Sequence, residues 1–394
     1  MFLLKNKIDK NLSYYLNHNS YKQYRVLIKC NNLRDNIVKK IHAYKGDVLY
    51  SLEYSNIICA KLNSTSIKRL IEYPEINYIC FDEYLFLCGI SVTKANKIYS
   101  SYTPTKTGKG IGIGVVDSGV FPHDDLLRPS NKIETFVDLI NGFKFPYDDN
   151  GHGTCTCGII SGSGISSNNM YRGMAPRSVL YCYKAFDKLG KGFVSDTLYS
   201  IEELIKNNFI RVLCLPFELL NHNIFIIDIF NTLFLKAIEK GITPIVPSGS
   251  NINIEGSIMG ISTLQSCITV GGIDTTISPT PYKFSSSGPY GKLDKPDISS
   301  ACVGIYSLNS NKNFVSEKDG IKLYPPKLDA YYKSFTGTSL AVASISGICA
   351  LLYEDKPSLS FHDISSLLKL SCELGDFNKN QLGEGILNVS RLLS

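Results

Sequence analysis

Three residues that lie far apart in the chain have the types that a serine nucleophile and its supporting groups require. Ser339 ends a small-residue turn, Gly-Thr-Ser at 337–339, that runs into an apolar stretch predicting a buried helix. Asp117 ends an apolar, strand-like run, and His152 stands between two glycines. An alcohol needs an imidazole to take its proton, and the imidazole needs a carboxylate to fix its tautomer and stabilise its charged form. Asp117, His152 and Ser339 are therefore predicted to form a catalytic triad.

The chain order of these residues, acid then histidine then serine, is the subtilisin order. Gly-His-Gly-Thr at 151–154 is similar to the histidine helix of the subtilisin-like serine proteases (subtilases), and the turn at 337–339 resembles their serine helix. Gly-Met-Ala-Pro at 173–176 and Lys-Pro-Asp-Ile at 295–298 also fit that family. The resemblance implies a serine endopeptidase that acts on polypeptide substrates and needs no cofactor for its chemistry.

From residue 110 onward, apolar strand-like runs alternate with helical segments, which predicts an α/β fold with a parallel sheet covered by helices on both faces. In such sheets the site lies beyond the carboxyl ends of the strands, and Asp117 ends its strand. The resemblance implies the same subtilisin-like architecture. The expected strands are 111–116, 179–183, 212–215, 243–247 and 267–271, and the expected helices are 155–161, 196–206 and 224–240.

The N-terminal part of the chain has a different pattern. Residues 1 to about 20 are polar and Asn-rich, which predicts a poorly ordered lead-in. From Tyr24 the order strand, helix, strand, strand, helix, strand predicts a small α+β, ferredoxin-like unit. Its expected strands are 25–30, 48–52, 57–62 and 76–81, and its expected helices are 33–43 and 64–73.

A unit of this topology in front of a catalytic domain resembles the subtilase propeptide, which is an intramolecular chaperone and inhibitor. The alternative is an independent ferredoxin-like module with a binding or regulatory role. We expect a tail and propeptide-like domain over residues 1–95 and a catalytic domain over 96–394. Self-cleavage is expected between residues 82 and 101.

The donor for the oxyanion is where the sequence departs most from the family. Subtilases place an asparagine after Ala-Gly, whereas this chain has Pro-Ser-Gly-Ser-Asn at 247–251. A gapless match puts Ser250 at the donor position and Asn251 one residue beyond. Either Ser250 donates through its shorter hydroxyl, or a shifted turn brings Asn251 into the role.

The substrate groove also departs from the family. A Ser-Leu-Gly edge strand that pairs with extended peptide is replaced by Cys-Leu-Pro at 214–216, and proline cannot donate to a ladder. Gly-Lys-Gly-Phe at 190–193 resembles the facing edge strand. The candidate substrate-binding residues are Gly190, Lys191, Gly192, Cys214, Leu215, Pro216, Ser248 and Gly249.

These observations leave two hypotheses for the function. The first is a serine endopeptidase that processes itself from a zymogen and is inhibited by its own propeptide. The second is a catalytically weak or inactive relative that binds and regulates another protein, which the altered oxyanion and groove segments favour. The intact set of Asp117, His152 and Ser339 favours the first, because binding alone does not need all three.

Charge and composition limit the classes of partner and the cellular location that we expect for this protein. The net charge of +6 is spread without a Lys/Arg block, so nucleic-acid binding is not indicated. No apolar run reaches the roughly 20 residues of a membrane span, and the start lacks a secretory signal, which predicts a cytoplasmic or otherwise intracellular protein. The 12 scattered cysteines predict reduced core thiols. Asp125 resembles a calcium ligand of many subtilases, and a solvated turn acid is the alternative.

Overall fold

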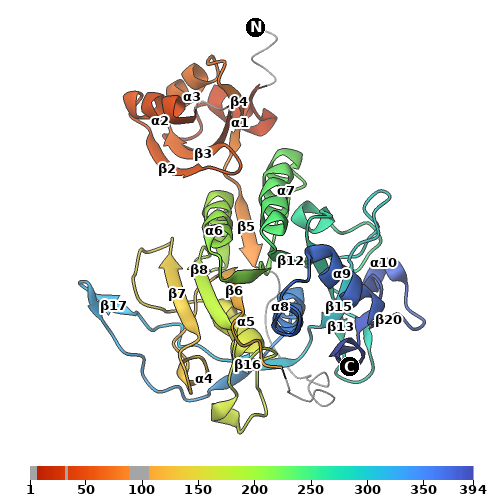
Figure 1. The fold of residues 1–394 in the computed structure, drawn as a ribbon. Helices are drawn as coiled ribbons and strands as arrows, with labels where there is room; N and C mark the ends of the chain where they lie inside the picture. Colours follow the sequence, from red (N-terminus) through yellow and green to blue (C-terminus); the bar gives the residue numbers. More distant parts are fainter. Residues whose placement is uncertain (1–6, 32–33, 88–105, 394) are drawn as a thin grey trace. The chain divides into compact units, whose positions relative to one another are not determined.

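The computed structural model describes residues 7–31, 34–87 and 106–393, which fall into two compact units (Figure 1). The first contains the chain up to Tyr84 together with Phe193–Glu202, and the second contains Leu85–Gly192 and Glu203–Ser394. The division falls before the expected boundary at residue 95, because residues 85–87 pair with a strand of the second unit. Residues 88–105, where the expected boundary and most of the expected cleavage region fall, lie outside the described residues.

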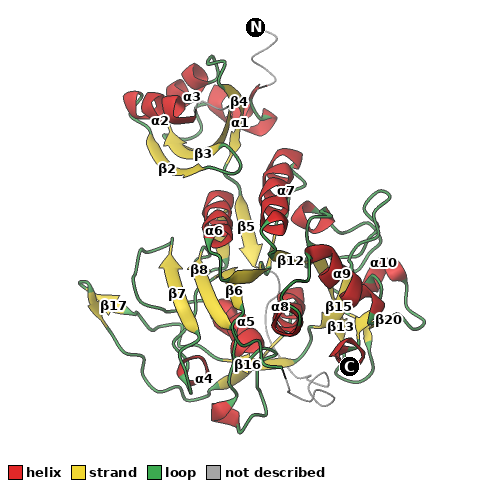
Figure 2. Cartoon of the chain, viewed as in Figure 1, coloured by secondary structure: helices red, strands yellow, loops and turns green. Residues whose placement is uncertain are grey.

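The first unit has the split βαβ arrangement that the sequence predicts. Its sheet has the order β2-β3-β1-β4 with antiparallel pairs, and α2 and α3 lie on one face of it (Figure 2). Isoleucines of the two helices pack with the apolar residues of the strands in one core. The elements are α1 (Lys10–Asn17), β1 (Tyr24–Cys30), α2 (Arg34–Ala43), β2 (Asp47–Leu52), β3 (Ile57–Leu62), α3 (Ser64–Leu70) and β4 (Ile76–Phe81).

Helix α1 corrects the expectation of a poorly ordered lead-in. Asp9 caps the helix by accepting the backbone N–H of Leu12 at 3.0 Å. Leu12 and Leu16, four residues apart and therefore on one face, are fully or almost fully buried in the core of the first unit. The helix was not predicted because the segment is mostly polar and only two leucines, four residues apart, mark its buried face.

The second unit is built on one large sheet with the order β20-β21-β15-β13-β12-β10-β6-β8-β7, and β14 pairs with β13. Every neighbouring pair from β21 to β7 is parallel, as predicted, while β20 and β14 are antiparallel additions. The strands are β6 (Gly112–Asp117), β7 (Ile133–Asp138), β8 (Val179–Lys184), β10 (Ile210–Cys214), β12 (Thr243–Pro247), β13 (Ile268–Asp274), β14 (Thr280–Pro281), β15 (Ile298–Ala301), β20 (Cys372–Glu373) and β21 (Ile386–Leu387).

Helices cover this sheet, and the longest of them is buried over its first sixteen residues. Helix α8 packs across β6, β10, β12, β13 and β15 with α5 beside it, and α7 packs on β12 (Figure 1). No helix within the described ranges is both long enough and apolar enough to cross a membrane. The helices are α4 (Asp124–Leu127), α5 (His152–Ser161), α6 (Val194–Lys206), α7 (Ile224–Glu239), α8 (Thr338–Asp355), α9 (Phe361–Leu370), α10 (Lys379–Leu382) and α11 (Val389–Leu393), with the 3-10 helices η3 (Ile165–Ser167) and η4 (Gly260–Thr263).

Short strands complete the architecture. They are β5 (Tyr84–Leu87), β9 (Lys191–Phe193) and β11 (Phe217–Glu218) in one three-stranded sheet, β16 (Ile305–Leu308) with β19 (Tyr332–Phe335), and the hairpin β17 (Glu317–Lys318) with β18 (Ile321–Lys322). Every cysteine that the structure describes is a free thiol, and all but Cys372 are buried, in agreement with the predicted core thiols.

Candidate active site

Asp117 and His152, two of the predicted catalytic residues, are in direct contact. Asp117 is the last residue of β6 and is 1% exposed, and His152 is the first residue of α5. The Nδ1 atom of His152 lies 2.8 and 2.9 Å from the two carboxylate oxygens of Asp117. An ionised carboxylate can only accept, so Nδ1 carries the proton and Nε2 keeps its lone pair. This is the tautomer that a general base for a hydroxyl requires.

A close approach of two backbone segments sets this geometry. A Cβ atom on Gly153 would lie 2.0 Å from the carbonyl oxygen of Gly119, which follows the Asp117 strand. Only glycine therefore lets the start of α5 come so near the end of β6. The glycine after the histidine is a packing requirement as well as a family signature.

Asp148, which the sequence analysis did not single out, holds the same two segments together. Its carboxylate is fully buried and accepts hydrogen bonds from the hydroxyl of Ser118, from the backbone N–H groups of Asn150 and Gly151, and from both the N–H and the hydroxyl of Thr154. These donors belong to the residue after Asp117 and to the turn that opens α5. Asp148 therefore fixes the position of His152 relative to Asp117 through the neighbours of both residues.

The ionised form of Asp148 is favoured in the folded protein. Burial by itself raises the pKa of Asp148, but hydrogen bonds from Thr154 and Gly151 and the charge of Lys184 outweigh burial and hold this pKa below its usual value. Lys184 is fully buried and donates to the carbonyl of Ser118 at 2.6 Å and to Asp149 at 2.6 Å. In the parallel pairing of β6 with β8, Lys184 lies opposite Asp117.

Ser339 occupies the second position of α8 and is fully buried. Its Oγ lies 3.0 Å from the carbonyl oxygen of Pro216, to which it donates. Helices α5 and α8 pack against each other, so the helix that begins with His152 and the helix that has Ser339 in its first turn are neighbours. The N-terminus of a helix favours negative charge, which suits the place where an oxyanion forms.

Strand β5 lies between the two segments that the sequence predicts as peptide-binding edges. It is the central strand of the order β11-β5-β9, and its pairing with β11 is antiparallel, with Leu87 opposite Phe217 and Phe86 opposite Glu218. An extended segment of the chain thus fills the place between β9 and β11 by strand addition. Strand β5 ends at Leu87, and the residues that follow are not described.

The edge formed by residues 214–218 differs in detail from the expectation. Cys214 ends β10 and is paired in the large sheet, and the N–H of Leu215 donates to a carbonyl of β12. Pro216 offers only its carbonyl, which Ser339 uses, so the pairing with β5 begins one residue later at Phe217. Cys214 and Leu215 are therefore sheet and core residues, and the strand that pairs with β5 is β11.

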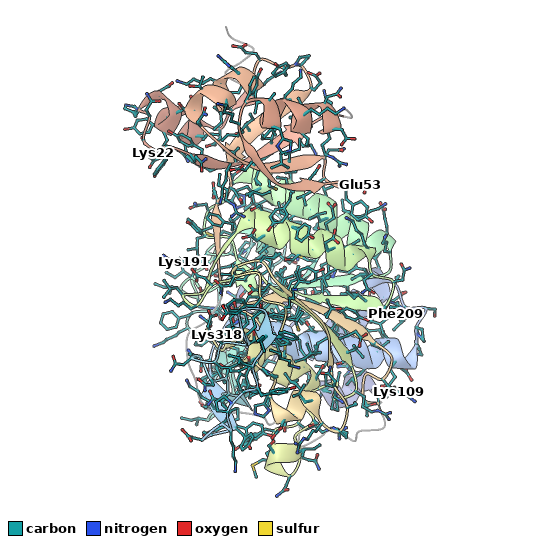
Figure 3. All side chains as sticks on the ribbon, turned by 90° about the vertical axis from the view of Figure 1, so that its left-hand side faces the viewer. Lys22, Glu53, Lys109, Lys191, Phe209 and Lys318 are labelled. Atoms are coloured by element: carbon teal, nitrogen blue, oxygen red, sulfur yellow. The ribbon has the colours of Figure 1, made fainter. Side chains whose placement is uncertain are left out.

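The edge on the other side of β5 contains the residues that the sequence predicts, Gly190, Lys191 and Gly192. Gly190 has a φ of 76° in the turn before β9, and Lys191 and Gly192 are in the strand. A Cβ atom on Gly192 would lie 2.4 Å from the carbonyl oxygen of Ala185, so this position accepts only glycine. The side chain of Lys191 is exposed and lies at the surface (Figure 3).

The turn with the two oxyanion candidates follows β12. The N–H of Ser248 donates to the carbonyl of Val270, and Gly249 has a φ of 111°. The N–H and the hydroxyl of Ser250 both donate to Glu218. The side-chain amide of Asn251 donates to the carbonyl of Ser257 at 3.1 Å. The Ser250 hydroxyl is thus already used within the protein.

The surroundings of Asp125 do not fit a calcium ion. Its fully buried carboxylate accepts the backbone N–H groups of Gly164 and Ser166, each at 3.0 Å, and the hydroxyl of Tyr332. These groups point hydrogens at the carboxylate, whereas calcium needs six to eight oxygen ligands. Within the described parts of the chain, no three His, Cys, Asp or Glu side chains are grouped as metal ligands. Asp125 is thus buried rather than a solvated turn acid, and the hydrogen bonds it accepts make it an anchor for the loop that contains η3.

Two of these residues left a signal in the sequence that the analysis did not use. Asp148 stands four residues before His152 in Asp-Asp-Asn-Gly-His, and Glu218 is an isolated acid in the apolar stretch Cys-Leu-Pro-Phe-Glu-Leu-Leu. An acid in such a stretch is expected to find a buried partner. The identity of the partner, Ser250, could not be inferred from spacing.

Comparison with known proteins gives consistent similarities. A model of the subtilase family matches residues 108–387. Serine protease AprX of Bacillus subtilis (strain 168) is 32% identical over 301 residues, which cover 72% of this chain and 66% of AprX, just under two thirds of its length. Subtilisin E of Bacillus subtilis (strain 168) is 26% identical over 361 residues, covering 87% of this chain and 82% of the relative. Among solved structures, fervidolysin from Fervidobacterium pennivorans, a keratinolytic enzyme related to subtilisin, has the same fold, with a TM-score of 0.73 at 18% identity over 95% of this chain and 61% of that chain.

The role of Asp148 predicts a pH-dependent loss of stability. Because its folded-state pKa lies below the unfolded value of about 3.9, the ionised carboxylate contributes stability above that pH, and this contribution is lost as the pH falls through the folded-state pKa. In an inactive Ser339→Ala background, Asp148→Asn should lower the free energy of unfolding by about 2 kcal/mol or more at neutral pH, because buried donors lose their acceptor. Urea denaturation at several pH values measures the loss, which should shrink below about pH 4. A loss of equal size at every pH would contradict this role, and Asp124→Asn, at a half-buried aspartate, is the control.

The anchor at Asp125 predicts how the protein responds to a chelator. Tyr332→Phe should destabilise the protein by about 1–3 kcal/mol, because it removes a hydrogen bond to a buried carboxylate. Tyr331→Phe removes the same atom from the adjacent residue, which does not touch Asp125, and serves as the control. Thermal melts with EDTA and with added calcium should give the same Tm for the wild type. A higher Tm with calcium that Asp125→Asn abolishes would show that this carboxylate does bind the ion.

Proposed function

Because the chain belongs to the subtilase family of serine proteases, we propose that it is a serine endopeptidase that uses Asp117, His152 and Ser339 as its catalytic triad. The observation that carries the proposal is the hydrogen bond from Nδ1 of His152 to the buried carboxylate of Asp117. The packing of α5, which begins with His152, on α8, which has Ser339 in its first turn, supports it.

The mechanism follows from these positions. Ser339 attacks the peptide carbonyl, and Nε2 of His152 takes the hydroxyl proton and later gives it to the leaving amine. Asp117 keeps His152 in the required tautomer and stabilises the imidazolium. The developing oxyanion lies at the N-terminus of α8, where the helix dipole and the backbone N–H groups favour negative charge. The substrate is a polypeptide in extended conformation, added as a strand beside β11.

We further propose that the N-terminal region is an inhibitory propeptide. Strand β5, which directly follows the ferredoxin-like unit, occupies the position between β9 and β11 that an extended substrate would take. In addition, residues 193–202, which lie inside the family-matched range, belong to the same compact unit as residues up to Tyr84. A segment that pairs as an extended substrate would, and whose last described residue lies opposite Phe217 next to the Pro216 that Ser339 contacts, is suited to inhibit the enzyme until it is cut.

The alternative, a catalytically weak relative with a regulatory binding role, is favoured by one observation. Ser250, one of the two candidates for the side-chain oxyanion donor and the one that a gapless match puts at that position, gives its hydroxyl to Glu218 instead. Loss of one such donor typically lowers kcat by about 10² to 10³, which slows an enzyme without abolishing its chemistry. The two experiments below separate a slow protease from an inactive one.

Self-processing is the first test. The wild-type protein should appear as two fragments, cut between residues 82 and 101, whereas Ser339→Ala should remain whole, because the hydroxyl that attacks the scissile carbonyl is gone. Intact-mass analysis of both purified proteins gives the result directly. Identical cutting of both would point to a contaminating protease, and an uncut wild type would favour the regulatory alternative.

Labelling by a fluorophosphonate tests the triad itself. The probe should modify Ser339 in the wild type, and His152→Ala should lose most of the labelling, because an alcohol is a poor nucleophile without its base. Mass spectrometry of the labelled peptide identifies the site. The exposed histidine variant His362→Ala is a matched control. Equal labelling of the wild type and His152→Ala would remove the triad from the mechanism.

A further inference from the structure

Glu218 is a buried carboxylate on the peptide edge that no step of the proposed mechanism uses. It is the second residue of β11 and is 5% exposed. One of its oxygens accepts the backbone N–H of Ser250 at 2.8 Å, and the other accepts the hydroxyl of Ser250. The carboxylate of Glu218 therefore accepts hydrogen bonds from both the backbone N–H and the hydroxyl of Ser250.

The carboxylate of Glu218 lies among groups that contact the nucleophile. Pro216, two residues earlier in the chain, accepts the hydrogen bond of Ser339. On the other side, the hydroxyl of Thr338 donates to the carbonyl of Gly249 at 3.2 Å. A Cβ atom on Gly249 would lie 2.9 Å from a carboxylate oxygen of Glu218, so this carboxylate is pressed against the backbone of the turn. Glu218 thus connects the peptide edge to the turn beside the start of α8.

The contact has a direct chemical consequence for the oxyanion. A serine hydroxyl has a single hydrogen, and an ionised carboxylate can only accept. While Glu218 is ionised and holds Ser250, that hydrogen cannot be donated to the tetrahedral intermediate. The negative charge of a nearly buried carboxylate also opposes the development of negative charge close to it.

We infer that Glu218 is a positioning residue that withholds the Ser250 hydroxyl from the oxyanion and thereby limits kcat. The inference rests on the proposed function, since it concerns the transition state of the same acyl transfer. In this protein the hydroxyl of Ser250, in the turn after β12, is held by the Glu218 carboxylate. A change at Glu218 makes this hydroxyl available to the oxyanion.

A double-mutant cycle with Glu218→Gln and Ser250→Ala tests the inference. Glutamine keeps a carbonyl oxygen for the Ser250 N–H, but its amide group donates toward the Ser250 oxygen, so the hydroxyl hydrogen becomes available and the charge is gone. Glu218→Gln should raise kcat on a peptide ester by about tenfold, with KM changed far less, because the gained interaction exists mainly in the transition state. Ser250→Ala should then cost about tenfold more in the Glu218→Gln background than in the wild-type background.

The controls distinguish this effect on kcat from a general structural disturbance and from a failure of the proposed function. Glu255→Gln neutralises an exposed glutamate shortly after the same turn and should leave kcat unchanged. Rates are divided by the fraction of protein that a fluorophosphonate labels at Ser339. If Ser339 does not label in the wild type, the proposed function fails, and this inference fails with it. If Ser339 labels but Glu218→Gln does not raise kcat, or Ser250→Ala costs the same factor in both backgrounds, only the inference is overturned.

A second variant keeps the test decisive if Glu218→Gln does not fold. In Glu218→Asp the carboxylate is one methylene shorter, so it should release the Ser250 hydroxyl while keeping the charge. We expect a smaller rise in kcat, and again a larger cost of Ser250→Ala than in the wild type. Equal costs in the two backgrounds would contradict the inference.

Discussion

The hydrogen bond between Asp117 and His152 is the interaction on which the site depends. It joins the carboxyl end of a central parallel strand to the first residue of a buried helix, and its donor and acceptor come from segments that no local structure brings together. The bond is possible only because the backbone of α5 approaches Gly119 more closely than any side chain would allow, and because Asp148 holds both segments. A buried carboxylate that receives several hydrogen bonds fixes its donors rigidly, since each donor left without it would be costly.

The large parallel sheet explains why these segments meet. Parallel strands end at the same edge, so Asp117 at the end of β6 and the turn after β12 both lie at that edge. Helix α8, which has Ser339 in its first turn, packs against the same strands. The peptide edges are short strands outside this sheet. Their geometry depends on single backbone features, such as the missing N–H of Pro216, which moves the paired edge to Phe217.

Much of this could be predicted from the sequence, because apolar runs and glycines mark the strands and close contacts directly. The strands of the first unit and most of the parallel strands lie within a few residues of their predicted bounds, and Asp117 ends its strand as its local pattern indicated. Helix α1 was missed because polar residues outnumber Leu12 and Leu16, the two residues of the helix that are buried in the core. The partners of Asp125 and Ser250 were missed because they come from distant segments, Gly164 to Ser166 with Tyr332 in one case and Glu218 in the other. Composition and spacing describe one segment at a time and cannot show which distant donor meets a buried carboxylate.

The central claim is that Asp117 holds His152 in the tautomer of a general base. Nitrogen NMR of protein labelled at its six histidines measures this tautomer directly in the inactive Ser339→Ala protein, with His152→Ala used to assign the resonance. The account predicts that neutral His152 carries its proton on Nδ1 in this protein and that Asp117→Asn shifts the tautomer population. A neutral His152 protonated on Nε2, or a tautomer unaffected by Asp117→Asn, would contradict it.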